Sequence, residues 1–110
     1  MVGNENISKT LRMMHDAARN EFSSSKHHRG IDILNDARIL EERVGFKNQA
    51  TESILEIAQA YFSIKNYDLA LWFAEEVLEK IQKNRPSSTA SKAIQLIERI
   101  KVEANTLLVT

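Results

Sequence analysis

The sequence predicts an all-α protein of about five helices joined as antiparallel hairpins. Three observations support this fold class. Apolar residues recur at helical spacing over most of the 110 residues, whereas no segment alternates apolar and polar residues as a half-buried strand does. The chain contains only one proline and three glycines, so helix breakers are rare. Short polar segments, at serines 23–25, near Gly45, at residues 65–68 and around Pro86, separate the apolar stripes.

The first two helices are expected over residues 7–22 and 28–44, and together they form a degenerate helical hairpin over about 7–44. The serines at 23–25 separate them, because serine hydroxyls hydrogen-bond the local backbone in competition with the helix. Gly45 is expected to end the second helix in a left-handed conformation. The predicted inward-facing residues are Leu11, Met14, Ala17, Ala18 and Phe22, followed by Ile31, Ile33, Leu34, Ala37 and Leu40.

The third helix is expected over residues 49–64 and the fourth over 67–83, with Asn66 as N-cap of the fourth. They form a second hairpin over about 49–84. Pro86 and its polar neighbours then break the chain, and Ser87 or Ser88 caps a C-terminal helix over about 89–108. The apolar stripe of this capping helix is Ala93, Ile94, Ile97, Ile100, Ala104 and Leu107, and its other face shows Lys92, Gln95, Arg99 and Glu103.

A degenerate internal repeat predicts how the hairpins pack within a single domain of residues 1–110. A shift of 40 residues superposes Gly30 on Ala70 and Ala18 on Ala58. Small residues allow two helices to approach closely where they cross. The predicted close-contact positions are Ala17, Ala18, Ala58, Ala70 and Ala74, with Tyr61, Leu71, Leu78 and Ile97 in the core.

Composition limits the classes of function. The formal net charge is zero, which disfavours non-specific binding to nucleic acid. The charge is uneven, because residues 51–84 carry 3 Lys/Arg and 6 Asp/Glu, whereas residues 85–110 carry 4 and 2. The chain has no cysteine and no apolar run long enough to span a bilayer. We therefore expect a cytoplasmic protein that has neither a cofactor nor a membrane partner.

Residues 54–82 carry the most specific pattern in the sequence. Ile54, Ile57, Ala58 and Tyr61 keep the spacing W-x2-L-G-x2-Y, and the alanines at 70 and 74 keep the later A-x3-F spacing. This segment resembles a tetratricopeptide repeat (TPR), a helical hairpin that stacks into short arrays. The resemblance implies a non-catalytic adaptor that binds a peptide or helix of another protein in a groove. Gln82 stands where the family usually has proline, so the fourth helix is expected to continue to Asn84.

The resemblance also places the groove on the first helix of each hairpin. It implies partner-binding roles for Glu52, Leu55, Gln59 and Phe62, and for Arg12, His15, Arg19 and Phe22. The second set reads as a cationic strip that ends in an aromatic residue, which suits an acidic partner because arginine binds carboxylates through two hydrogen bonds. Alternatively, the strip is only the solvated side of an amphipathic helix. Leu69 and Trp72 lie off the main apolar stripe, and they either pack on the fifth helix or form contacts in a homo-oligomer.

Two alternative functions remain open at this point. The segments around Tyr61, Tyr67 and Ala74 also resemble the small helical HEPN domains, some of which are ribonucleases of toxin pairs. Their R-x(4–6)-H motif is not matched, because seven residues separate Arg19 from His27. The second alternative is a self-associating structural domain. Adjacent His27 and His28 cannot easily share one metal ion, and no serine stands at a nucleophile elbow, so neither a metal site nor an enzyme is expected.

Overall fold

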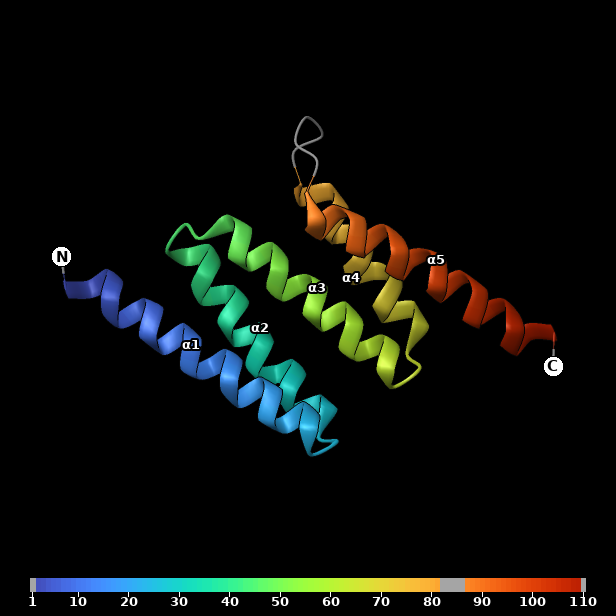
Figure 1. Ribbon diagram of the computed structural model, residues 1–110, viewed down its shortest axis with the longest axis horizontal. Helices are drawn as coiled ribbons and strands as arrows, with labels where there is room; N and C mark the ends of the chain where they lie inside the picture. Colours follow the sequence, from blue (N-terminus) through green and yellow to red (C-terminus); the bar gives the residue numbers. More distant parts are fainter. Residues whose placement is uncertain (1, 82–86, 110) are drawn as a thin grey trace. The chain divides into compact units, whose positions relative to one another are not determined.

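Five α-helices and no strand make up the residues that the computed structural model describes, 2–81 and 87–109, as the sequence predicts. Side chains are described for residues 5–81 and 87–106. The helices are α1 (Val2–Ser23), α2 (His27–Arg43), α3 (Lys47–Ser63), α4 (Tyr67–Lys80) and α5 (Ser88–Val109), shown in Figure 1. The predicted break at Asn84 to Pro86 and the predicted inward position of Leu107 lie outside these described residues.

The first three interhelical turns share one geometry. The residues that end α1, α2 and α3 in left-handed backbone are Ser25 (φ 62°), Gly45 (φ 83°) and Lys65 (φ 65°). The residue after each of them donates its N–H to a backbone carbonyl in the last helical turn. For example, the Phe46 N–H donates to the backbone carbonyl oxygen of Glu41 at 2.8 Å. This is the Schellman arrangement, which satisfies carbonyls that a helix end leaves unpaired. The prediction for Gly45 is confirmed, and the same turn recurs every twenty residues.

The start of α4 and the start of α5 are capped as the sequence predicts. The Asn66 side chain accepts a hydrogen bond from the Leu69 N–H at 3.3 Å, and the Ser87 hydroxyl oxygen accepts one from the Ala90 N–H at 3.0 Å. The predicted end of α4 is wrong. The helix stops at Lys80, because Ile81 adopts an extended conformation (φ −84°, ψ 132°) and packs against the apolar core.

The chain divides into two units, Met1–Ser53 and Ile54–Thr110, and the division falls inside α3. In the first unit α1 and α2 pack as an antiparallel hairpin (Figure 1). Phe22, at the end of α1, lies over Gly30 in the first turn of α2. Ala17 is exposed rather than a close-contact position, because it lies one residue away from the buried stripe. The buried apolar residues of this unit are Leu11, Ala18, Ile31, Leu34, Ala37 and Ala50.

In the second unit, α4 and α5 pack together and α4 folds back on the second half of α3. Ala58, Ala70 and Ala74 are fully buried, as predicted for close helix crossings. Tyr61, Leu71, Leu78 and Ile97 are half-buried and pack against the core. The stripe on α5 is rotated from its predicted position, since Leu96 is buried and Ile94 is exposed. The core of this unit comprises Ile54, Leu55, Ala58, Ala70, Ala74, Val77, Ala93, Leu96 and Ile100.

The contact between Phe22 and Gly30 predicts a context-dependent effect of Gly30→Ala. A methyl group on Gly30 would lie 2.7 Å from both Cδ1 and Cζ of the Phe22 ring, well inside van der Waals contact. We expect the substitution to destabilise the wild-type protein by about 1–2 kcal/mol. In a Phe22→Ala background the clash is gone, and the same substitution should stabilise the helix by up to about 1 kcal/mol. Urea unfolding of the four proteins, followed by circular dichroism, measures this cycle. Equal effects in both backgrounds would contradict the contact.

The burial of Ala74 predicts that a larger side chain at this helix crossing lowers the stability of the protein. Because Ala74 is fully buried in the core of the second unit, Ala74→Leu should overpack the crossing and lower the free energy of unfolding by roughly 1–3 kcal/mol. Ala17→Leu is the matched control, since Ala17 is exposed and the same enlargement does not enter the core. Thermal unfolding of both variants tests this assignment, and it fails if the two melting temperatures shift alike.

Candidate functional site

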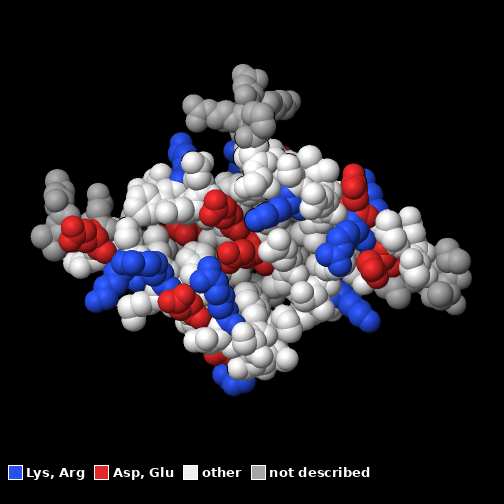
Figure 2. All heavy atoms as spheres, viewed as in Figure 1, with Lys and Arg blue, Asp and Glu red and all other residues white. Residues whose placement is uncertain are grey.

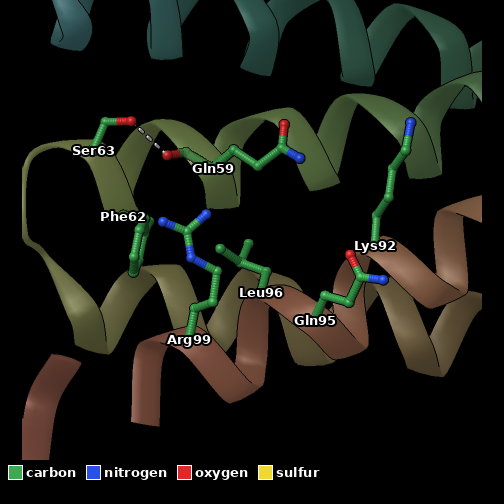
Figure 3. Close-up of a pocket in the computed structure, with 7 residues that line it drawn as sticks. All are labelled: Gln59, Phe62, Ser63, Lys92, Gln95, Leu96 and Arg99. Atoms are coloured by element: carbon green, nitrogen blue, oxygen red, sulfur yellow. Dashed lines mark hydrogen bonds between the residues drawn. The ribbon is translucent and has the colours of Figure 1, made fainter. Parts of the chain in front are cut away.

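The second unit contains a hollow of about 270 Å³ between the end of α3 and the middle of α5. We call it the α3–α5 hollow. Figure 3 shows side chains from both helices around it, with the phenyl ring of Phe62 beside the guanidinium of Arg99 and the Lys92 chain extending toward α3 at the other end. Its lining residues are Gln59, Phe62, Ser63, Lys92, Gln95, Leu96 and Arg99.

Helical periodicity explains why these residues meet. Gln59, Phe62 and Ser63 are spaced i, i+3 and i+4, so they share one face of α3. Lys92, Gln95 and Arg99 are spaced i, i+3 and i+7 on α5. Leu96 belongs to the core and also lines the hollow, where it provides an aliphatic surface. The hollow is therefore polar at its rim and apolar at its base.

Two cations dominate the electrostatics of the hollow. The Arg99 guanidinium carbon lies 4.9 Å from the centroid of the Phe62 ring, a cation–π contact that orients the guanidinium without neutralising it. Within the described residues, neither Lys92 nor Arg99 forms an ion pair with a carboxylate. Gln59 and Gln95 add amide groups that donate and accept hydrogen bonds. The arrangement suits an anionic group attached to an apolar or aromatic body.

The structure separates the four partner-binding residues predicted on α3. Gln59 and Phe62 line the hollow. Leu55 is only 5% exposed and belongs to the core of the second unit, so its predicted groove position is a packing position. Glu52 is exposed and lies in the part of α3 that belongs to the first unit.

The four residues predicted as a strip on α1 also have different surroundings. Arg12 and Arg19 are exposed, and Arg19 Nη1 lies 3.3 Å from Oδ1 of Asp16 in a surface ion pair. Phe22 packs over Gly30, and its ring lies 5.9 Å from the ring of His27. His15 turns toward α2. An exposed face on α1 thus offers two arginines rather than a continuous strip of four residues.

His15 belongs to a buried polar cluster that the sequence did not reveal. Glu41 is 2% exposed, yet its Oε1 accepts a hydrogen bond of 2.6 Å from the hydroxyl of Ser53. Its Oε2 lies 3.1 Å from Nε2 of His15. Glu41 therefore joins α1, α2 and the first half of α3. The sequence did contain a sign of this cluster. Glu41 lies four residues after Ala37, in the buried stripe of α2, and a charged residue in such a position needs polar partners.

This His–Glu–Ser cluster is arranged for stability rather than for nucleophilic catalysis. In a catalytic triad the histidine stands between the nucleophile and the carboxylate. Here the carboxylate of Glu41 receives the Ser53 hydroxyl directly, and His15 Nε2 lies 3.5 Å from that hydroxyl oxygen. Ser53 is also fully buried, so a substrate has no access to it.

Exposed residues elsewhere offer further surfaces. Leu69 and Trp72 of α4 are 38% and 61% exposed, so neither is buried against the fifth helix and both can contact a partner. Positive and negative side chains are interspersed over the face of the molecule seen in Figure 2. Among the described residues, no three His, Cys, Asp or Glu side chains are grouped to hold a metal ion. No described helix is both long and apolar enough to cross a membrane.

Comparison with known proteins gives no relative for this chain. It matches no protein-family model, no curated protein and no solved structure.

The buried cluster predicts a large loss of stability when Glu41 is removed. Glu41→Ala leaves His15 and Ser53 without their shared partner in a buried site, and breaking a buried pair costs about 3–5 kcal/mol. Glu42→Ala is the matched control, because Glu42 is exposed and its ion pair with Arg38 is a surface contact. Urea unfolding should be followed by circular dichroism, since the single tryptophan lies in the other unit. Similar unfolding midpoints for the two variants would exclude a structural role for the cluster.

Proposed function

We propose that this chain is a TPR-like, non-catalytic interaction module that binds an acidic segment of another protein in the α3–α5 hollow. The observation that carries the proposal is a hollow with Arg99 on the aromatic ring of Phe62 and Lys92 at its other end (Figure 3), neither cation having a carboxylate partner in the described part of the chain. The sequence-level resemblance supports it, because Gln59 and Phe62 are groove positions of the repeat that it implies.

The chemistry of the hollow favours a particular kind of ligand. A carboxylate that approaches Arg99 can accept two hydrogen bonds from the guanidinium, while an apolar or aromatic neighbour of that carboxylate lies on Phe62 and Leu96. Lys92, seven residues earlier on the same face of α5, supplies a second positive charge about two helical turns away. A peptide or helix with acidic residues flanking one large apolar side chain fits this spacing.

The α3–α5 hollow is a better acceptor for such a ligand than the face of α1. Arg19 already contacts Asp16, and His15 is engaged with Glu41. The aromatic residue predicted beside Arg12 and Arg19 is also engaged elsewhere, because Phe22 packs over Gly30.

The proposal predicts a charge-dependent interaction with a defined probe. The probe is a short fluorescein-labelled peptide with glutamates around one tryptophan, and its control has glutamine in place of every glutamate. We expect the acidic peptide to raise fluorescence anisotropy, and the glutamine peptide to have little effect. Lys92→Gln/Arg99→Gln should weaken binding by about tenfold or more, because it removes both charged donors. Binding should also weaken as salt rises.

Two controls make this measurement specific to the hollow. Lys101→Gln removes an exposed positive charge from α5 outside the hollow, and it should leave the affinity unchanged. Arg12→Gln/Arg19→Gln removes the exposed charges of α1. If the α1 variant loses the peptide while the hollow variant keeps it, the binding site is the predicted strip on α1 and the present proposal is wrong.

A further inference from the structure

Trp72 is the largest exposed apolar side chain among the described residues of the second unit, and its ring contacts a neighbouring ring. Its ring meets the ring of Phe73 edge to face, with centroids 5.0 Å apart and an interplanar angle of 87°. Phe73 in turn stacks on Tyr61 at 5.6 Å, and both pack against the core. The indole is thus held in place while 61% of the residue remains exposed to solvent. A rigid, exposed tryptophan is the side chain most often found as an anchor of protein interfaces.

Acidic side chains surround this tryptophan. Asp68, Glu75 and Glu79 lie four residues before, three after and seven after Trp72, so they share its side of α4, and all three are exposed. None of the three forms an ion pair within the described residues. The only basic residue of α4 is Lys80, at its last position. We call Asp68, Leu69, Trp72, Glu75 and Glu79 the α4 face.

The α4 face has the properties that the α3–α5 hollow requires of a ligand. It presents a large aromatic side chain flanked by carboxylates on a preformed helix. The hollow presents one cation on an aromatic ring and a second cation at its other end (Figure 3). We infer that the α4 face of one copy of this chain docks in the α3–α5 hollow of a second copy. The inference rests on the proposed function, because it names the occupant of the same hollow.

No residue of α4 lines the hollow, so the donor and acceptor surfaces of one copy are different surfaces. Two copies can bind each other through both pairs of surfaces across a two-fold axis, which closes the complex as a dimer. Without that symmetry, one free hollow and one free α4 face remain on every open complex, and association continues into a larger ring or an open chain. One helix face against one hollow is a small interface, so assembly should be reversible and should depend on protein concentration.

Two variants block the two surfaces separately. Lys92→Glu/Arg99→Glu reverses the charge of the hollow and leaves the α4 face intact. Trp72→Ala/Glu75→Gln/Glu79→Gln removes the anchor and two carboxylates from the α4 face and leaves the hollow intact. All five side chains are exposed, so neither variant removes a core residue, and circular dichroism checks that both remain folded.

Sedimentation velocity then distinguishes the arrangements. Wild type should form dimers or larger species whose share grows with concentration and shrinks at high salt, whereas each variant alone should be monomeric. Mixed in equal amounts, the two variants should form a 1:1 dimer and nothing larger, because only one intact hollow and one intact α4 face can meet. Lys101→Glu, outside both surfaces, should assemble like wild type. A monomeric wild type, or an equal mixture that stays monomeric, overturns the inference, as does a discrete wild-type dimer that the hollow variant retains.

The peptide measurement separates failure of this inference from failure of the proposed function. The α4-face variant keeps the intact hollow, so it should bind the acidic tryptophan peptide with the affinity expected of a free site. If it binds the peptide but wild type is monomeric at every concentration, the hollow takes an acidic partner other than a second copy. If it does not bind the peptide, and wild type is monomeric, both proposals are wrong.

Discussion

Three-residue turns closed by a left-handed residue set the geometry on which the rest of this chain depends. Because the N–H groups after the left-handed residue return to the last helical turn, each helix ends abruptly and the next begins within three residues. The following helix must then run back along the preceding one. Its first turn lies beside the last turn of its neighbour, where there is little room. Gly30, Ala50 and Ala70, each five residues after a left-handed residue, are correspondingly small and buried.

Within this frame, the two units are stabilised by different chemistry. The second unit has an apolar core to which three helices contribute alanine, leucine and isoleucine side chains. The first unit adds a buried carboxylate, whose two oxygens are occupied by a serine hydroxyl and a histidine ring. A buried charge is tolerated only when its partners are in place, so Glu41 fixes the register of α1 and of the first half of α3 against α2.

The acidic α4 face and the cations of the α3–α5 hollow lie on different helices of the second unit, although the formal net charge of the chain is zero. α4 contributes carboxylates around an exposed tryptophan, while the face of α5 toward α3 contributes Lys92 and Arg99. Each group of charged residues includes an aromatic ring that packs on other residues. Trp72 packs on Phe73, and Phe62 packs against the core. Complementary charge with a rigid aromatic on each side is the arrangement expected of surfaces that recognise one another.

The sequence by itself determined the helices, their N-caps at Asn66 and Ser87, the left-handed end at Gly45 and the small residues at the crossings. These features follow from local hydrogen bonding and from the period of the helix, both of which depend only on residues close together in the sequence. Only the tertiary structure decided which polar residues line the hollow and which form the buried cluster. The sequence assigned no role to the polar side of α5, whereas packing places Lys92, Gln95 and Arg99 opposite Gln59 and Phe62. His15 looked like a surface residue until the approach of α2 and α3 enclosed it with Glu41 and Ser53. Likewise, α4 ended at Lys80 because Ile81 packs against the core. A periodic pattern tells which side of a helix is apolar, but the neighbours of a polar side chain come from distant parts of the chain, and these are known only when the helices have packed.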